Sequence, residues 1–355
     1  KMDPQIEMSV VWSIYPLGNL YPLKDFSVKL LAIFLVILLT WLNTQRVQSS
    51  GRFQLIASVV NGAILLLIPI LIFTSDNGDS AHFFKGASTL SSASTITGWA
   101  AALTGAFFAL DGWINIVSIA GEVNNPAKTI PRTLFLGVLI CLALYLLMNQ
   151  AYLYVLPVEK MAQAHVVAAD ALQVARGPLA AGLVSLLIVF CTIGALNGNI
   201  MASSRITYAM GKQQVFPSFL GARNASTGSP TAALWLHGGW ISFLIFSGSF
   251  DMLADMYVFV TWMAYGLAAL AVFRLRKTSP NLSRPYRVWA HPLTTGIFIV
   301  FSFSYLLVTL YNDVYLFSIG QKPVVNSLVG LLFVLTGLPL YAYYNKSNKK
   351  DTFIK

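Results

Sequence analysis

One carboxylate lies in the middle of an otherwise apolar stretch. In AALTGAFFALDGWINIVSIAGE, residues 101–122, Asp111 is followed directly by Gly112 and, four residues after the aspartate, by Asn115. An aspartate at the centre of a membrane helix costs about 2.5–3.5 kcal/mol on insertion scales, so it normally faces a polar cavity or a partner. Gly105 and Gly112 weaken the helix on both sides of it. The pattern predicts a broken helix whose free backbone groups line a binding site. A buried aspartate that caps a kink, with glycines for packing, remains the alternative.

Two aromatic residues precede the aspartate. Phe107 and Phe108 lie too deep in the apolar stretch to be interface anchors, which belong at the membrane surface. We expect one of them to cover a bound ligand.

Neutral polar residues occur within two other apolar stretches. Asn61 lies about a third of the way along residues 53–74, where an amide needs a partner, and an interhelical hydrogen bond is its simplest role. Asn197 lies in CTIGALNGNIMASSRITYAM, residues 191–210, beside Gly194, which suits close helix packing. Asn197 either hydrogen-bonds to a neighbouring helix or reaches a substrate pathway, and the sequence favours neither.

Catalytic patterns are not found in the sequence. The histidines are scattered through loops and span ends, and the cysteines lie inside apolar stretches without metal-ligand or disulfide spacing. No nucleophile triad accompanies Asp111. We therefore expect no enzyme, no metal and no cofactor. These histidines and cysteines are His82, His165, His237, His291, Cys141 and Cys191.

The elements that must position these residues are helices in lipid. The chain of 355 residues is 56% hydrophobic and 10% charged, with a mean hydropathy of +0.68, whereas soluble domains carry about 25% charged residues. Its apolar stretches have the length of about 20 residues that crosses a bilayer. We expect an all-α polytopic membrane protein in a single domain, 1–355. The nine predicted spans are 28–44, 53–74, 99–120, 133–156, 179–208, 231–248, 252–274, 292–311 and 324–344.

Loop charge predicts the orientation. Sixteen of the 23 basic residues fall in alternate loops and the C-terminal tail, and basic loops face the cytoplasm. We expect a cell-membrane protein, inner or plasma membrane, with a cytoplasmic C terminus. The net charge of +10 has no continuous basic face, so nucleic acid is not expected as a partner.

The start of the chain is the least regular part. MSVVWSIYPLGNLYPL, residues 8–23, is too rich in proline and glycine for a span and is interpreted as the frayed end of a preceding helix. No signal-peptide pattern is present, and the initial Lys1 leads us to expect that the chain is cut from a longer protein.

Three segments together resemble the amino acid, polyamine and organocation transporter superfamily, and within it the L-type amino-acid transporters and their bacterial relatives. They are FFALDGWINIVSIAGEVNNPAKTIPR (107–132), GALNGNIMASSRITYAMGKQQVFPSFL (194–220) and PNLSRPYRVWAHP (280–292). The resemblance runs from about Lys29 to the C-terminal tail.

The resemblance implies a LeuT-like fold, a five-plus-five inverted repeat with two additional helices. Residues 28–74 would end the first repeat, residues 96–274 would form the second, and residues 291–345 would be the additional helices. The first three helices of the family would then be absent, including the one whose glycine-rich turn binds the substrate carboxylate.

The resemblance also implies roles for site residues. The third span corresponds to the family's sixth helix, with Phe108 as the aromatic gate above the substrate. Backbone groups of Phe108, Ala109 and Leu110 would bind the substrate's amino group, while Asp111, Gly112 and Trp113 form the unwound turn. The remaining expected gating or pathway residues are Phe107, Asn61, Asn115, Asn197 and Glu122, the last at the cytoplasmic end of the helix.

One position departs from the bacterial members. Asn61 stands where they commonly have a lysine whose ammonium is thought to replace a sodium ion, so lysine- or proton-linked coupling is in doubt. Ala195 cannot supply a side-chain ligand where sodium-dependent relatives bind the ion, and we expect no bound sodium.

Together these features predict a secondary amino-acid transporter or exchanger, for neutral substrates, that works by alternating access. The alternative is a truncated, non-transporting paralogue that acts as an amino-acid-binding sensor or a membrane subunit. A polytopic membrane enzyme would need a catalytic cluster that the sequence does not contain. The sequence predicts no oligomeric state.

Overall fold

The protein is almost entirely helical. The computed structural model describes residues 11–14, 18–45, 47–84, 95–118, 120, 123–164, 166–281, 284 and 286–352. The helices are α2 (Phe26–Thr44), α3 (Val47–Phe73), α4 (Thr95–Leu110), α5 (Asn115–Ser118), α6 (Pro126–Val155), α7 (Val158–Gln163), α8 (Val167–Arg176), α9 (Pro178–Lys212), α10 (Thr231–Ser247), α11 (Phe250–Thr278), α12 (Leu293–Ser318) and α13 (Asn326–Thr352), with 3-10 turns η1 (Ser80–Phe83) and η4 (Ser218–Gly221).

The predicted fold class, a polytopic helical membrane protein, is confirmed. Within the described residues, eight helices are long and apolar enough to cross a membrane. The remaining predicted span, 231–248, is the apolar helix α10, which has only 17 residues and a length of about 26 Å at 1.5 Å per residue. Several helices extend beyond the predicted apolar windows, because polar residues at their ends continue the helical hydrogen bonding. One example is α12, predicted to end at residue 311 but ending at Ser318.

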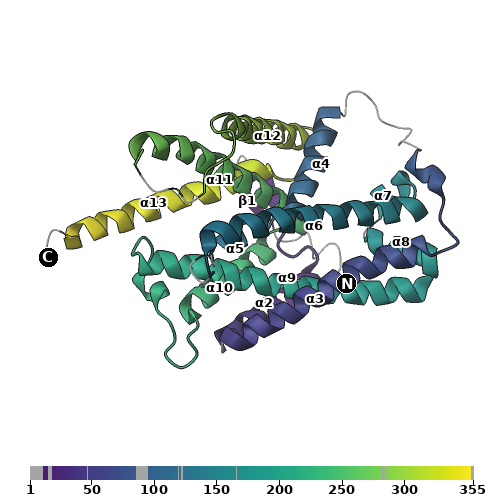
Figure 1. The fold of residues 1–355 in the computed structure, drawn as a ribbon, viewed down its shortest axis with the longest axis horizontal. Helices are drawn as coiled ribbons and strands as arrows, with labels where there is room; N and C mark the ends of the chain where they lie inside the picture. Colours follow the sequence, from purple (N-terminus) through teal and green to yellow (C-terminus); the bar gives the residue numbers. More distant parts are fainter. Residues whose placement is uncertain are drawn as a thin grey trace.

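The helices form two packing groups. One contains α2, α3, α6, α8, α9 and α10, and the other contains α4, α11, α12 and α13. Figure 1 shows α4, α11 and α12 in the upper half and α2, α3, α9 and α10 in the lower half, with α6 between them. Most contacts of each helix are made within its own group.

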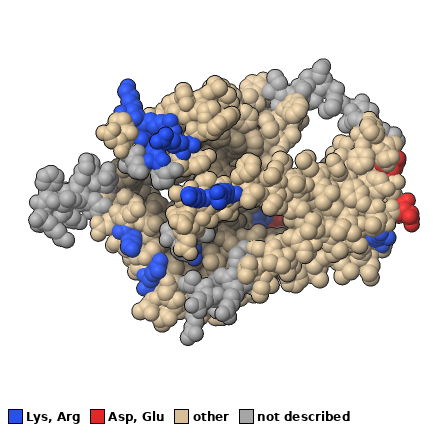
Figure 2. Space-filling view, in the orientation of Figure 1, with Lys and Arg blue, Asp and Glu red and all other residues tan. Residues whose placement is uncertain are grey.

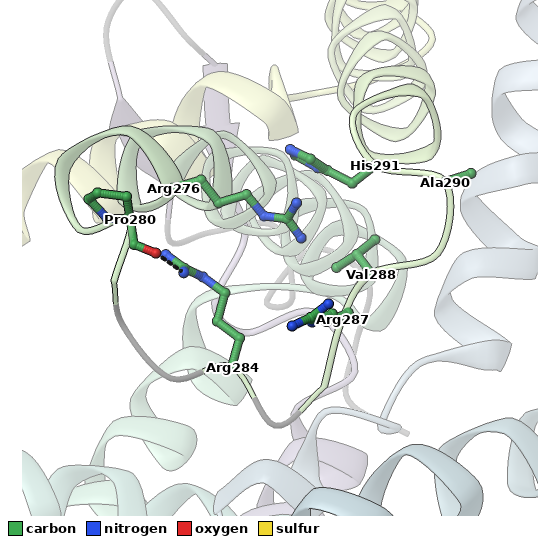
Figure 3. Close-up of a pocket in the computed structure, with 7 residues that line it drawn as sticks. All are labelled: Arg276, Pro280, Arg284, Arg287, Val288, Ala290 and His291. Carbon is green, nitrogen blue, oxygen red and sulfur yellow. Dashed lines mark hydrogen bonds between the residues drawn. The ribbon is translucent and has the colours of Figure 1, made fainter.

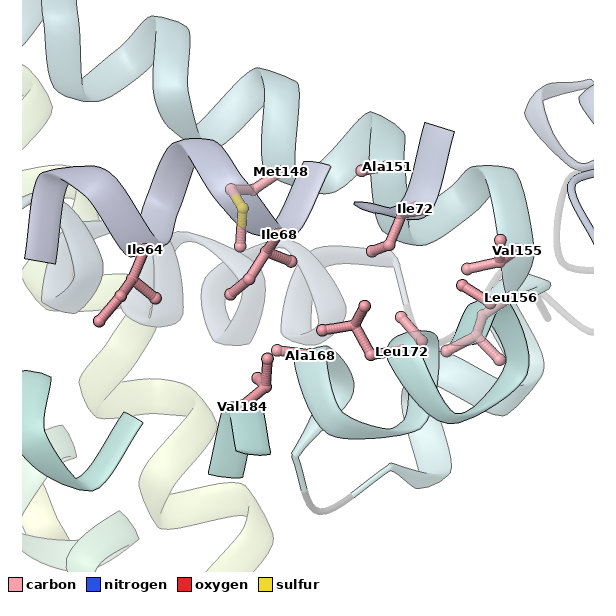
Figure 4. Close-up of a cluster of buried hydrophobic side chains, with 12 residues drawn as sticks. Ile64, Ile68, Ile72, Met148, Ala151, Val155, Leu156, Ala168, Leu172 and Val184 are labelled. Atoms are coloured by element: carbon pink, nitrogen blue, oxygen red, sulfur yellow. The ribbon is translucent and has the colours of Figure 1, made fainter. Parts of the chain in front are cut away.

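The first group has the largest apolar core. Its buried residues come from α3, α6, α8 and α9, together with Leu156, which directly follows α6 (Figure 4). In α8, Ala168, Ala171, Leu172 and Ala175 are buried at the i, i+3, i+4, i+7 spacing of one helix face. The predicted spans omitted α7 and α8, because both are too short to cross a membrane.

Small residues allow close approach between helices of this group. A Cβ added to Gly194 of α9 would lie 2.8 Å from the Cβ of Ala57 in α3. A Cβ added to Gly238 of α10 would lie 2.8 Å from Oγ1 of Thr40 in α2. Helices in lipid associate largely through such close packing. The packing role expected of Gly194 is therefore present in the fold.

Outward-facing side chains on these helices are apolar. On α6, for example, Phe135 is 71% exposed and Ile140 is 58% exposed. A soluble protein rarely leaves a large apolar patch uncovered. In a bilayer, such side chains contact lipid tails.

The beginning of the described chain is a hairpin, not the end of a helix as the sequence suggested. β1 (Trp12–Ile14) pairs antiparallel with β2 (Gly18–Leu20), with Trp12 opposite Leu20. Gly18 has φ +127°, and a Cβ there would lie 2.0 Å from the Pro323 carbonyl oxygen. Only glycine fits this position, so the hairpin lies directly against the connection between α12 and α13.

Candidate functional site

The predicted interruption in the third span is present. α4 ends at Leu110 and α5 begins at Asn115. Between them, Gly112 has φ +101°, in the region that glycine adopts readily. The backbone N–H of Asp111 reaches the carbonyl of Phe108 at 3.4 Å, and that of Asn115 reaches the carbonyl of Gly112 at 3.1 Å. We refer to residues 111–114 as the helix break.

Asp111 is fixed by two phenols of α11. The hydroxyl of Tyr265 donates to its Oδ1 at 2.7 Å, and the hydroxyl of Tyr257 donates to Oδ2. Charge-assisted hydrogen bonds are about twice as strong as neutral ones. This arrangement supplies the partner that an aspartate requires at this depth, and it attaches the helix break to α11.

The two phenylalanines before the break face different neighbours. Phe107 packs on Trp262 at a centroid distance of 4.1 Å and edge-on to Tyr305 at 5.0 Å. Phe108 packs edge-on to Phe250 at 5.7 Å and to Tyr257 at 6.3 Å. Phe107 is therefore part of an aromatic cluster with α11 and α12, whereas Phe108, 40% exposed, lies beside a cavity.

Two cavities lie beside α4, and the second of them is also lined by residues of the helix break. The Phe108 cavity has a volume of about 290 Å³. The Asp111 cavity has a volume of about 230 Å³. The first is lined by Ala100, Ala101, Thr104, Gly105, Phe108, Phe250, Asp251, Ala254, Asp255, Thr309, Asn312, Asp313, Leu316 and Lys322, and the second by Phe107, Leu110, Asp111, Trp113, Val138, Trp262 and Tyr265.

Carbonyl groups at the end of α4 also face the break. The last four carbonyls of a helix have no partner within it and form the negative end of its dipole. Of these, the Ala109 oxygen accepts a hydrogen bond from the Tyr145 hydroxyl at 2.7 Å, and the Phe108 oxygen accepts from Asp111. The end of α4 therefore offers acceptors suited to a positively charged group.

The segment after the break belongs to the other packing group. Nδ2 of Asn115 donates to Oδ1 of Asn199 in α9 at 3.2 Å, and α5 packs on α9, whereas α4 packs on α11 and α12. The helix break therefore joins the two groups.

An ion cluster borders both the Phe108 cavity and a third cavity, of about 330 Å³, which is partly lined by Asn19 and Leu20 of the hairpin. Lys322, Asp255 and Asp251 line both cavities. Nζ of Lys322 lies 2.7 Å from Oδ2 of Asp255 and 2.9 Å from Oδ1 of the buried Asp313. Burial alone would lower the pKa of Lys322, but its hydrogen bonds to the two carboxylates outweigh burial, so this pKa is raised. The cluster ties α11, α12 and the connection to α13 together.

Some predicted residues lie away from the break. Asn197 is buried between α9 and α2, where its Oδ1 accepts from Nδ2 of Asn43 at 2.7 Å. Nδ2 of Asn61 reaches the carbonyl of Cys191 in α9 at 3.4 Å. These contacts are the interhelical bonds that the sequence left open for both residues. Glu122 lies outside the described residues.

Other parts of the site were missed from the sequence. Tyr257, Tyr265 and Tyr145 are ordinary members of apolar spans, and Lys322 reads as a loop lysine. The spacing of Tyr257 and Tyr265, eight residues apart, places them near one helix face and was the available signal. Within the described ranges, no group of three or more His, Cys, Asp and Glu side chains could hold a metal ion.

Comparison with known proteins agrees with the family resemblance. The chain is 27% identical over 328 residues to the serine/threonine exchanger SteT of Bacillus subtilis, covering 92% of this chain and 71% of that protein. It is 28% identical over 319 residues to the b(0,+)-type amino acid transporter 1 of Mus musculus, covering 88% and 62%. It is 26% identical over 340 residues to the cystine/glutamate transporter of Homo sapiens, covering 94% and 64%.

The chain thus spans less than two thirds of the length of several curated relatives that it matches. A sequence profile of the family described as "Amino acid permease" matches residues 8–339. This match includes the helix break, both cavities beside α4 and the ion cluster. The chain therefore belongs to the amino acid permease family.

Proposed function

We propose that the protein carries amino acids across a membrane by alternating access, with the helix break as part of the substrate site. The observation that carries this proposal is the position of the break. α4 packs on α11 and α12, α5 packs on α9, and residues 111–114 connect them. A rocking movement of one group against the other would change the backbone at this point first.

The amino group of the substrate would bind at the end of α4. A substrate ammonium is a hydrogen-bond donor and a cation, which suits the carbonyls of Phe108, Ala109 and Leu110 at a helix C-terminus. Asp111 supplies a carboxylate nearby, held in place by the two tyrosines. Phe108, which lines the neighbouring cavity at the end of α4, would act as the aromatic gate.

The substrate side chain would be neutral. Apart from Asp111 and Tyr265, the Asp111 cavity is lined by apolar and aromatic residues, which favour an uncharged side chain over a charged one. We propose exchange rather than net uptake, as the similarity to SteT, a serine/threonine exchanger, suggests. The pathway or its gating would depend only indirectly on four further polar residues. These are Asn61, Asn115, Asn197 and Glu122.

The protein would lie in a cell membrane with its C terminus in the cytoplasm. Figure 2 shows Lys and Arg gathered toward the left side of this face, the side at which Figure 1 marks the C terminus. The Asp and Glu visible in this view lie mainly at the opposite end. This asymmetry agrees with the positive-inside rule. Residues 28–74, 96–274 and 291–345 would be the end of the first repeat, the second repeat and two additional helices.

Counterflow in proteoliposomes tests the proposal. Vesicles with the protein at its native length would be loaded with one unlabelled amino acid and offered labelled neutral, cationic and acidic ones. We expect saturable uptake of neutral amino acids that depends on internal amino acid. Binding measured by thermal shift without any uptake would favour the sensor alternative. The absence of both binding and uptake would contradict the proposed substrate class.

A further inference from the structure

A basic pocket lies at the junction of α11 and α12. It has a volume of about 700 Å³, and its lining includes Arg276, Arg284, Arg287 and His291. In Figure 3 the side chains of Arg276 and His291 approach from above and that of Arg287 from below, around one space. No Asp or Glu is among the described residues that line it.

Arg284 holds the shape of this pocket. Its guanidinium donates to the carbonyls of Ser279 at 2.7 Å, Pro280 at 3.0 Å and Leu275 at 3.3 Å. Leu275 lies in the last turn of α11 and the other two carbonyls directly follow the helix, a place where a cation is favourable. Arg284 therefore has a structural role, and it fixes the loop on which Arg287 lies.

Arg276 and Arg287 have no neutralising carboxylate within ion-pair distance in the part of the chain that the structure describes. His291 is held on one side, with Nδ1 3.1 Å from the Thr295 hydroxyl. Several like charges around one cavity repel one another, and a bound anion would relieve that repulsion. Guanidinium groups bind phosphate through parallel N–H donors, which makes arginine well suited to that anion.

The surroundings place the pocket at a membrane surface. The pocket lies where the C-terminal end of α11 is connected to the N-terminal end of α12, and both helices are long enough to span a membrane. Beside it, Trp289 is 82% exposed and Tyr286 is 60% exposed. Exposed tryptophan and tyrosine are typical of the headgroup region. Leu293 and Ile297, in the first turns of α12, also present apolar side chains outward.

We propose that this pocket binds a phosphate group, and that its occupant is the headgroup of an anionic lipid. The phosphate would lie between Arg276 and Arg287, the aromatic side chains would lie among neighbouring headgroups, and the acyl chains would follow the apolar start of α12. Basic pockets between helices at a membrane surface are suited to such lipids. The inference does not depend on transport, because its residues are separate from the helix break.

Thermal unfolding of the purified protein in a neutral detergent tests this site. We would titrate phosphatidylglycerol and phosphatidylcholine separately. Inorganic phosphate would be titrated in a third series, with chloride at equal ionic strength as its control. The test variant is Arg276→Gln with Arg287→Gln. The matched control is Arg274→Gln with Lys277→Gln, which removes the same amount of charge from the end of α11, outside the pocket. The single variant Arg287→Gln, at an exposed position, covers the case in which the double variant folds poorly.

For the wild type and the control, we expect phosphatidylglycerol to raise the unfolding temperature at similar concentrations. Phosphatidylcholine should require a higher concentration for the same rise. The test variant should need about tenfold more phosphatidylglycerol or more, as expected for lost charge-assisted hydrogen bonds. An equal shift by inorganic phosphate that depends on the two arginines would support the phosphate site but overturn the lipid as its occupant. Equal responses of the wild type and the variants, or equal loss in the test and control variants, would overturn the site.

Discussion

Removing one hydroxyl that binds Asp111 tests whether the hydrogen bond between the helix break and α11 controls the equilibrium between the two access states. Tyr265→Phe deletes the donor 2.7 Å from Asp111 and keeps the ring that packs on Trp113 at 5.1 Å. A hydrogen bond to a charged group contributes about 1.5–3 kcal/mol. Tyr265 is partly exposed and Tyr257 still donates to Asp111, so the expected contribution of the Tyr265 hydrogen bond is about 1.5–2 kcal/mol. This corresponds to a change in an equilibrium constant by a factor of roughly 10 to 30. If the tie forms in only one of the two access states, the equilibrium between them shifts by that factor.

The assay is the initial rate of amino-acid counterflow, with thermal unfolding of the same preparations. Tyr311→Phe is the matched control, because Tyr311 is 65% exposed on α12 and the same atom is deleted. We expect Tyr265→Phe to slow counterflow by about 10- to 30-fold, and Tyr311→Phe to leave it unchanged. In a double-mutant cycle, Asp111→Asn should make the effect of Tyr265→Phe much smaller. Equal rates and equal stability for the two tyrosine variants would refute the reasoning.

The remaining predictions concern the gate, the ion cluster and one buried amide. Phe108→Leu should raise KM for uptake by about three- to tenfold, because edge-on aromatic contacts each contribute about 0.5–1.5 kcal/mol; an unchanged KM would exclude Phe108 as the gate. Lys322→Gln should lower the free energy of unfolding by about 1–3 kcal/mol, a value reduced for partial exposure, and Asp255→Asn in the same chain should restore part of it. The pKa of Lys322 is raised above 10.5. The stabilising effect of Lys322 is therefore fully present below that pH and is lost as the pH rises through the folded-state pKa. An unfolding temperature that fell between pH 7 and 9 in the wild type, but not in Lys322→Gln, would contradict this. Asn197→Ala should cost about 1–3 kcal/mol of stability without changing KM, and a changed KM would return this residue to the substrate pathway.

The helix break was predictable because its signal is local. A charged residue and a glycine within an apolar run are each unfavourable in a regular membrane helix, and Asp111 and Gly112 are adjacent in the sequence. The partners of Asp111 were not predictable in the same way. Tyr257 and Tyr265 are far away in the sequence, and tyrosine is common in apolar spans, so only the packing of α4 on α11 identifies them.

The ion cluster shows how a span boundary can hide a site. The predicted span 292–311 ended before Asp313, because hydropathy falls there, and Lys322 was counted only as a loop charge. In the structure α12 continues to Ser318, which brings the buried Asp313 to the end of a helix beside Lys322. Pairing between distant charges depends on tertiary packing, which apolar periodicity does not report.

The short elements were missed for a different reason. β1 and β2 have three residues each, too few for the alternation that predicts a strand. Their stability comes partly from contact with the α12–α13 connection, where Gly18 fits against Pro323. By contrast, eight of the nine predicted spans coincide with helices in the described residues that are long enough to cross a bilayer, since about 20 apolar residues are required to cross it.

The most direct test of the proposed function is counterflow with Gly112→Ala beside Gly296→Ala. Gly112 has φ +101°, whereas Gly296 lies within α12 with open space at its Cβ position. Alanine should strain the helix break by about 1–2 kcal/mol and favour a continuous helix, and it should be tolerated in α12. We predict that Gly112→Ala loses most amino-acid counterflow while Gly296→Ala keeps it, with both variants folded. Counterflow by Gly112→Ala at the wild-type rate would contradict the account of the break as the moving substrate site.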